Sequence, residues 1–294
     1  MVKNGLGITS PFLVISLFAV MIGTVPPRVS EEAVAPGAIE GARRVAILAS
    51  VLTSYVAIDQ GFDGVAAVSE FTRRIEKRGI FGQLFPQVMT LPAAGFMGDI
   101  PDPEQILRVS PDAVIAWQGD FESLRKVGYP GLVGLEPVLP DGLKVTWDIL
   151  GRVSGRDVRS ASLWQDAEAR QRRLEALLPS GEPIKVLPMA AYDDGRVWVG
   201  KKDNFLNALL QQVGGINPAR DALYHGLADP EEVLLYDPDI IISPGGDVSR
   251  DLKGIYGNPI WQLLHAVRDK RVYVMPYTSP SNELVDRTLA LIWL

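Results

Sequence analysis

Short apolar runs alternate along the chain with segments whose apolar residues recur every three or four positions. The runs are continuous in Val, Ile, Leu and Ala, a pattern typical of strands that are buried on both faces of a parallel sheet. We predict strands over 45–50, 65–69, 112–117, 132–135, 185–191, 239–243 and 271–276. Helices are predicted over 51–60, 103–109 and 205–213, around 233–235, and over 259–264 and 283–294, whereas 70–100 is predicted to be rich in loops. This alternation favours an α/β fold with parallel sheets.

The longest helical pattern lies in the middle of the chain. Residues 147–178 contain no proline and only two glycines. From Val158 to Leu178 the composition is mostly Ala, Leu, Arg, Glu and Gln, which predicts one helix of about 20 residues. The sequence therefore predicts two Rossmann-like lobes with parallel sheets, 36–146 and 183–294, joined by one long interdomain helix within 147–182.

The two halves share a sequence unit. Residues 102–115 and 229–242 are identical at seven of fourteen aligned positions. Each copy indicates a helix of one or two turns that begins at Asp-Pro-Glu, then a Pro-Asp turn and a buried strand. Proline stands where a helix must stop, and aspartate where a turn begins. The repeat supports two lobes that are built on a shared plan.

Composition narrows the functional classes. The 294 residues are 47% apolar and 22% charged, with a net charge of −6, which disfavours both a disordered chain and a nucleic-acid-binding protein. Because there is no cysteine, disulfides, Fe–S clusters, Cys-type zinc sites and cysteine nucleophiles are excluded. The two histidines, His225 and His265, are too few for a histidine-rich metal cage. The sequence has no nucleophile elbow, P-loop or glycine-rich nucleotide fingerprint, so we predict no catalytic residue, no metal site and no cofactor.

The amino terminus has the pattern of a secretory signal peptide. Lys3 precedes an apolar run, 12–22, in which Ser16 is the only polar residue, and small residues follow downstream. The run is shorter than the roughly 20 apolar residues that a membrane span needs. We assign 1–35 to a signal peptide or linker and expect the protein to be exported. A membrane anchor and a buried strand or helix are the alternatives.

The repeated unit and its surroundings resemble the substrate-binding proteins of ABC importers, and in particular the class with a single helix between the lobes, which serves iron–siderophores, haem, cobalamin and some oxyanions. The unit Glu-x-Ile/Val-Leu-x-x-x-Pro-Asp occurs in both halves. Residues 200–217 resemble the helix of that class that leads into a Gly-Gly-x-Asn turn, and 261–273 resemble its last helix-to-strand step. The resemblance covers residues 43–294. It implies a monomeric, periplasmic, non-enzymatic protein that delivers a small-molecule metal chelate to a permease and its ATPase.

Two features depart from that class. Its usual lipoprotein cysteine is missing, which predicts a freely soluble periplasmic protein that is not lipid-anchored. The chain also ends on Ile292, Trp293 and Leu294, where relatives continue with another surface segment. We therefore expect a truncated C-terminal lobe with an uncovered apolar helix end.

In parallel α/β sheets, ligands bind at the carboxyl ends of the strands. Applied to the predicted strands, that rule selects the following candidate ligand-binding residues: Tyr55, Arg73, Arg74, Trp117, Gln118, Tyr192, Arg196, Trp198 and Tyr277. Trp and Tyr supply flat apolar surface, and Arg supplies a planar cation for carboxylate or catecholate oxygens. The set suits a bulky anionic iron chelate. The alternatives are core or wall positions for the aromatic residues, a solvated charge run for Arg73 and Arg74, and an axial haem ligand for Tyr192.

Two glutamates receive a separate role from the resemblance. In that class one glutamate on each lobe docks to arginines of the permease, and the matching positions here are Glu104 and Glu231. Both lie in the first turn of a predicted helix, where a carboxylate also interacts favourably with the helix dipole. That local role is the alternative.

The function expected from the sequence is therefore that of an extracytoplasmic solute-binding protein, which captures a ferric chelate of the siderophore type for an ABC importer. Cobalamin, haem and molybdate are the alternative ligands within the class. An exported sensor domain or an enzyme on the same fold is the alternative outside it. The long helix between the lobes predicts only a small closure when ligand binds.

Overall fold

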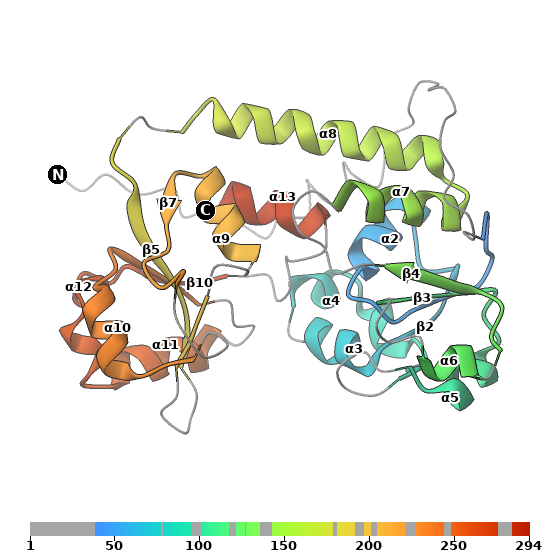
Figure 1. Ribbon diagram of the computed structural model, residues 1–294, viewed down its shortest axis with the longest axis horizontal. Coiled ribbons are helices and arrows are strands. Elements are labelled where there is room, and N and C mark those ends of the chain that lie inside the picture. Colours follow the sequence, from blue (N-terminus) through green and yellow to red (C-terminus); the bar gives the residue numbers. More distant parts are fainter. Residues whose placement is uncertain are drawn as a thin grey trace.

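The computed structural model describes residues 39–77, 79–95, 101–117, 122–126, 128–135, 143–178, 181–191, 197–200, 205–221, 227–243, 248–275 and 284–294. Within these residues the chain forms two α/β lobes side by side, with one long helix, α8, running along the outside of both (Figure 1). This arrangement confirms the fold class expected from the sequence. The predicted signal segment, 1–35, lies outside the described residues.

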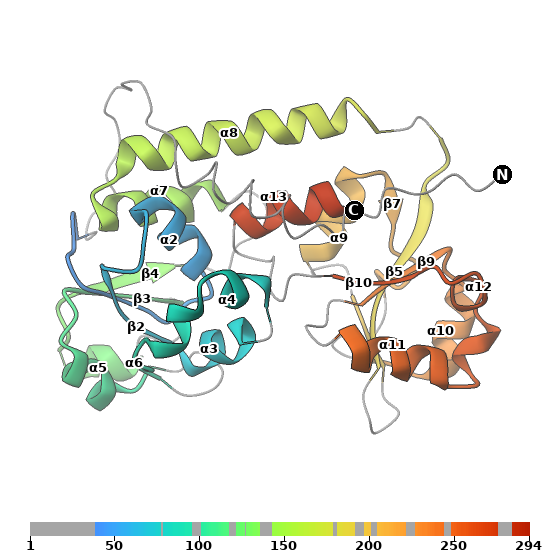
Figure 2. The same ribbon diagram turned by 180° about the vertical axis from the view of Figure 1, so that it is seen from behind.

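The first lobe contains a four-stranded sheet in the order β2-β1-β3-β4, in which every pair is parallel. Its strands are β1 (Val45–Ile47), β2 (Val65–Val68), β3 (Ala113–Trp117) and β4 (Leu132–Leu135). The three residues of β1 are all completely buried, as their unbroken apolar sequence predicts for a central strand. Two short helices, α5 (Pro103–Val109) and α6 (Glu122–Lys126), lie beside this sheet (Figures 1 and 2).

Helix α2 (Leu52–Asp59) is enclosed on all sides. Its residues from Leu52 to Ile58 are all buried, because the helix lies among α7, α8 and α13 in addition to the sheet that it follows. A helix that is apolar around its whole circumference belongs in a core. It ends where Gln60 adopts the left-handed conformation with φ of 71°, close to the end of the helix predicted over 51–60.

The loop-rich prediction for 70–100 was wrong over 70–90. This stretch forms α3 (Glu70–Glu76), α4 (Ile80–Leu84) and the 3₁₀ helix η1 (Pro86–Thr90). Ser69 caps α3 by accepting a hydrogen bond from the Thr72 backbone N–H at 3.0 Å. The rings of Phe62, Phe81 and Phe85, with centroids 5.1–6.0 Å apart, pack α4 onto the lobe. Pro86 stands at the start of η1, where a missing N–H costs nothing.

The connection between the lobes consists of two helices, α7 (Leu143–Ser154) and α8 (Asp157–Glu175). The break is at Gly155, which has a φ of 66°. Trp147 on α7 is buried and donates its Nε1–H to the Ser160 carbonyl at 2.7 Å, and Ser160 Oγ donates to the Trp147 carbonyl at 3.1 Å. The predicted long helix is thus confirmed as α8. The two hydrogen bonds between Trp147 and Ser160 hold α7 against the first turns of α8.

The second lobe contains a mixed sheet in the order β10-β9-β5-β6-β8, and β7 pairs with the start of β5. Its strands are β5 (Ile184–Ala191), β6 (Val197–Val199), β7 (Gly215–Ile216), β8 (Leu227–Ala228), β9 (Ile240–Ser243) and β10 (Val272–Val274). The strands β5, β9 and β10 are parallel, as predicted, whereas β6 and β8 add an antiparallel extension. The helical elements are α9 (Phe205–Gln212), α10 (Pro230–Tyr236), α11 (Val248–Gly257), η5 (Trp261–Leu263) and α12 (His265–Arg268). The predicted helix over 259–264 is thus only the short 3₁₀ turn η5.

The last helix, α13 (Leu284–Trp293), lies between the two lobes beneath α8 (Figures 1 and 2). It packs against α8 and α2 on one side and against α9 of the second lobe on the other. Its buried residues 289–291 belong to a single hydrophobic cluster that contains core residues of both lobes. The prediction of an uncovered apolar end was wrong, because Ile292, Trp293 and Leu294 are half-buried and the last two contact this cluster.

The sequence repeat is a structural repeat. Asp112 accepts hydrogen bonds from the backbone N–H groups of Arg43 and Arg44, each at 3.0 Å, just before β1. Its counterpart Asp239 accepts a hydrogen bond from the backbone N–H of Lys185, the second residue of β5, at 3.0 Å. In both lobes, the aspartate of the Pro-Asp turn therefore fixes the beginning of a neighbouring strand.

The contact between α7 and α8 leaves no room for a larger side chain at Gly151. A Cβ atom there would lie 2.7 Å from the Ser160 Cβ and 2.8 Å from its Oγ. We expect Gly151→Ala to lower the free energy of unfolding by about 1–3 kcal/mol, because the helices must separate. Gly254→Ala is the matched control, since Gly254 lies in α11 with nothing within 4 Å of its Cβ position. Chemical denaturation should show a loss for the first variant alone, and equal stabilities would contradict the tight contact.

Candidate ligand-binding site

The carboxyl edge of the first sheet is the natural ligand-binding edge of this lobe. From β1 the chain forms β2 on one side and then β3 on the other, so the strand order reverses at β1. Ligands in open α/β sheets bind outside the carboxyl ends of the strands at such a reversal. Trp117 is the last residue of β3 and is half-buried, with its inner part against the core. The structure thus places Trp117 at the edge to which the sequence assigned it.

Arg73 and Arg74 lie on α3, which follows β2 at the same edge and lies on the side of the first lobe that faces the second (Figure 2). Arg73 is half-buried and its guanidinium approaches Glu70 at 3.6 Å. Its Nε is buried without a hydrogen-bond partner in the described part of the chain. Arg74 is exposed. The predicted charge run therefore contains one arginine that is held partly inside the protein with a donor unused.

Tyr55 does not lie at this edge, contrary to the expectation. Its side chain is completely buried, because α2 is enclosed on all sides. Burial raises the pKa of Tyr55, with a smaller contribution from Asp59, and keeps the phenol neutral. The hydroxyl has no hydrogen-bond partner among the described residues. Tyr55 is therefore a core residue in this structure.

In the second lobe, Trp198 lies on β6 opposite Ala190, near the carboxyl end of β5. It is half-buried and contacts the cluster that both lobes share. Each predicted tryptophan thus lies near the carboxyl edge of a sheet, with part of its side chain covered by core, although Trp117 ends a parallel strand and Trp198 lies on the antiparallel extension. Four predicted site residues, Gln118, Tyr192, Arg196 and Tyr277, lie outside the described residues.

Sequence reasoning missed Arg287. It lies on α13, between the lobes, where it is partly buried. Its Nε is buried and has no hydrogen-bond partner in the part of the chain that the structure describes. Burial lowers the pKa of the Arg287 guanidinium. The available signal was an arginine inside a mostly apolar helix, directly before Thr288 and Leu289, which are both buried.

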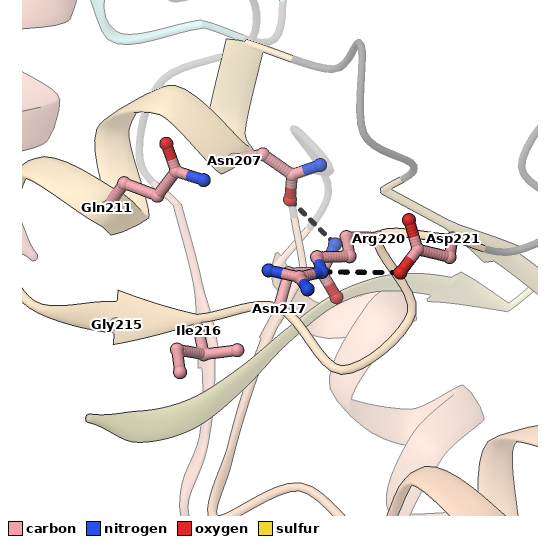
Figure 3. A pocket seen from close by; sticks show the side chains of 7 residues that line it. All are labelled: Asn207, Gln211, Gly215, Ile216, Asn217, Arg220 and Asp221. Atoms are coloured by element: carbon pink, nitrogen blue, oxygen red, sulfur yellow. Dashed lines mark hydrogen bonds and ion pairs between the residues drawn. The ribbon is translucent and has the colours of Figure 1, made fainter. Parts of the chain in front are cut away.

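A separate pocket of about 270 Å³ lies in the second lobe beside α9 and β7 (Figure 3). Asn217 organises its inner side: its Nδ2 donates to the Gly200 carbonyl and to Asn207 Oδ1, the latter at 2.6 Å, and its Oδ1 accepts from the Ala219 N–H at 2.9 Å. These bonds satisfy the Asn217 amide and fix the turn after β7. Because β7 pairs with the first two residues of β5, the pocket borders the amino end of that strand. It is therefore distinct from the carboxyl edge where Trp198 lies.

The described residues contain no cluster of three or more His, Asp or Glu side chains that could hold a metal ion. Among the helices of the described part, none is long and apolar enough to cross a membrane. The described side chains at the two carboxyl edges include the partly covered indole rings of Trp117 and Trp198 and the half-buried guanidinium of Arg73.

Comparison with known families decides between the classes that share this fold. The family model of the periplasmic binding proteins matches residues 87–278, which include the later part of the first lobe, α7 and α8, and most of the second lobe. The chain belongs to this family. A curated relative, the iron-uptake system-binding protein of Bacillus subtilis, is 22% identical over 183 residues, which are 59% of this chain and 58% of the relative. The match thus spans less than two thirds of that relative's length.

Solved structures show the same fold. The periplasmic binding protein of Haemophilus influenzae for molybdate has a TM-score of 0.69 and 16% identity, over 87% of this chain and 85% of that one. The vitamin B12 binding protein of Vibrio cholerae has a TM-score of 0.65 and 20% identity, over 85% of this chain and 94% of that one. At these identities the likeness establishes the two-lobed fold of this periplasmic binding protein and leaves its ligand open.

The buried Tyr55 hydroxyl gives a test of whether this residue contacts ligand. Removing an unsatisfied buried hydroxyl relieves a desolvation cost, so we expect Tyr55→Phe to raise the free energy of unfolding by about 1 kcal/mol and to leave ligand affinity unchanged. Tyr129→Phe is the control, because the Tyr129 hydroxyl donates to the Pro111 carbonyl and its loss should be destabilising. Urea denaturation measures both. A weaker ligand affinity for Tyr55→Phe would return Tyr55 to the binding site.

Proposed function

We propose that this periplasmic binding protein captures a ferric chelate of the siderophore type outside the cytoplasm and delivers it to an ABC importer. The observation that carries the proposal is the family match across both lobes, together with the two half-covered tryptophans and the half-buried Arg73 at the carboxyl edges. The name of the curated relative, an iron-uptake system-binding protein, supports iron as the cargo.

The chemistry of these residues supports a large anionic ligand. An indole ring whose inner part is fixed in the core offers a flat surface at little entropic cost. The half-buried guanidinium of Arg73 suits carboxylate or catecholate oxygens, which arginine binds through two parallel hydrogen bonds. Haem and cobalamin are also large ligands, and each has a flat ring face that could lie against an indole ring. They are therefore the nearest alternatives. Molybdate, which the Haemophilus influenzae neighbour binds, needs a small polar pocket and gains little from tryptophan.

The proposal includes the place of the protein in the cell. An N-terminal signal peptide would export it to the periplasm, and a chain without cysteine has no site for the usual lipid anchor. We propose a monomer that is free to diffuse between ligand and importer. Its net charge of −6 does not oppose an anionic ligand, because the local position of arginines sets the field at the site.

A fluorescence titration tests the ligand. The purified protein is titrated with a ferric siderophore, haemin, cobalamin and molybdate while tryptophan emission is recorded. We expect saturable quenching by the ferric siderophore at micromolar or lower concentration. Arg73→Gln should weaken this binding about tenfold, the size of one charge-assisted hydrogen bond. Arg172→Gln on the exposed face of α8 is the control for loss of positive charge. Quenching by another of the four ligands alone would replace iron by that cargo, and no binding by a folded protein would favour a sensor domain.

Delivery requires contact with the permease, for which we propose Glu104 and Glu231. The structure places them at equivalent positions in α5 and α10, each the second residue of its helix after a proline. Asp102 and Asp229 cap these helices, so the glutamate carboxylates are not needed as caps. Both glutamate side chains are exposed, and neither carboxylate takes part in a hydrogen bond or ion pair within the described part of the chain. They are therefore available to arginines on a partner.

Charge reversal tests this docking role. We expect Glu104→Lys combined with Glu231→Lys to abolish importer-dependent uptake of the ligand and to leave its affinity for the isolated protein unchanged, because both residues lie outside the ligand-binding edges. Glu168→Lys combined with Glu182→Lys is a control with the same change in net charge at other exposed positions. Uptake measured in proteoliposomes separates the two variants, and unchanged uptake by the first one would refute the docking role.

A further inference from the structure

Arg287 lies in the first turn of α13, just before a part of the helix that belongs to the core. Residues 288–291 are all buried, and four successive residues cover the whole circumference of a helix. The Arg287 side chain is partly buried, and its Nε is enclosed without a hydrogen-bond partner in the part of the chain that the structure describes. A cationic side chain therefore stands where α13 enters the core that both lobes share.

The first turn of α13 lies on the side of the first lobe. Figures 1 and 2 both show the C-terminal end of the chain beside α9 of the second lobe, so the helix begins at the end that points toward the first. In the first lobe α13 packs against α2. Helix α2 follows the carboxyl end of β1 after a short loop. Arg287 is thus on a helix that contacts the element leading away from the ligand-binding edge of the first sheet.

The position of Arg287 is unfavourable for a cation in two ways. Burial lowers the pKa of its guanidinium, which means that the surroundings disfavour the charged form, although an arginine stays charged at neutral pH. A cation in the first turn of a helix also opposes the positive end of the helix dipole. Among the described residues, no carboxylate forms an ion pair with Arg287 to offset these costs. Residues that break local rules in this way are expected at functional sites.

Helix α13 also connects the two proposed ligand-binding edges. The hydrophobic cluster that contains residues 289–291 packs against Trp117 of the first lobe and Trp198 of the second. Arg287 lies two residues before this buried run. The guanidinium is therefore at the boundary of the core on which both indole rings rest.

We infer that Arg287 selects the ligand by its charge: its guanidinium pairs with an anionic group of the ligand held between the lobes, so that the protein prefers anionic ferric chelates to uncharged ones. This inference rests on the proposed function and specifies the class of ligand. A chelate of Fe³⁺ with three catecholate groups has a net negative charge, whereas one with three hydroxamate groups has none. Arginine matches the paired oxygens of the first kind through two parallel hydrogen bonds.

A pair of chelates with the same metal and different charge tests the inference. Tryptophan fluorescence is recorded while the protein is titrated with a ferric tris-catecholate and, separately, with a ferric tris-hydroxamate siderophore. We expect the unchanged protein to bind the tris-catecholate at least tenfold more tightly. Arg287→Met should weaken binding of the tris-catecholate about tenfold or more and leave binding of the tris-hydroxamate unchanged, because methionine keeps the apolar stem and removes the charge. Arg287→Lys keeps the charge and should retain part of the preference.

Thermal unfolding without ligand gives a second readout. If Arg287 has no partner inside the protein, Arg287→Met removes a buried charge and should raise the melting temperature by about 2–4 °C. Arg172→Met is the matched control, because Arg172 is exposed on α8, and it should change neither the melting temperature nor the preference between the chelates. A lower melting temperature for Arg287→Met would show that an internal carboxylate, such as that of Glu283 four positions earlier in the sequence, already pairs with Arg287, and would overturn the inference.

The binding results separate this inference from the proposed function. If the unchanged protein binds the uncharged chelate as tightly as the anionic one, or if Arg287→Met keeps the preference, charge selection by Arg287 is overturned while capture of a ferric chelate stands. If the unchanged and folded protein binds neither chelate, the proposed function fails, and this inference fails with it.

Discussion

The structure depends on one hydrophobic cluster that continues through both lobes. Helix α13 carries it: residues 289–291 pack against α8 and α2 on one side and against α9 on the other. Leu289 and Leu291 each contribute about 1.5–3 kcal/mol by leaving water, so a motion that pulled α13 away from either lobe would be costly. The α7–α8 junction reinforces the first lobe with two reciprocal hydrogen bonds between Trp147 and Ser160. The relative position of the lobes is therefore a property of the folded core and not of a flexible linker.

A stiff connection has consequences for how the protein holds a ligand. Trp117 and Trp198 pack against the core cluster, and as proposed ligand contacts their rings would be held in place before ligand arrives, which would reduce the entropy that binding must overcome. Arg73 and Arg287 each keep a buried Nε without a partner in the described part of the chain.

The sequence predicts the strands well because their signal is local: β1, β3, β4 and β9 are short unbroken apolar runs. It fails at 70–90, where Gly82 and Pro86 suggest loops but Ser69 and the phenylalanine cluster impose helices. Tyr55 shows a second limit. Its distance along the chain from β1 suggests the ligand-binding edge, whereas packing of α2 against distant α7 and α13 buries it. Arg287 was missed for the same reason, since only the folded structure brings its helix between the lobes.

The repeat connects these features. In each lobe the aspartate of the Pro-Asp turn accepts a hydrogen bond from backbone N–H at the start of a neighbouring strand, and the helix before it presents an exposed glutamate. The buried half of this sequence unit begins a sheet strand, and its exposed half carries the glutamate for which we propose contact with the permease. Because the strand and the helix are only a turn apart, the exposed half has a fixed place on its lobe. The shared core then fixes the distance between the two copies. A partner that contacts both copies at once therefore binds best at one relative position of the lobes. Ligand-induced closure would change that relative position.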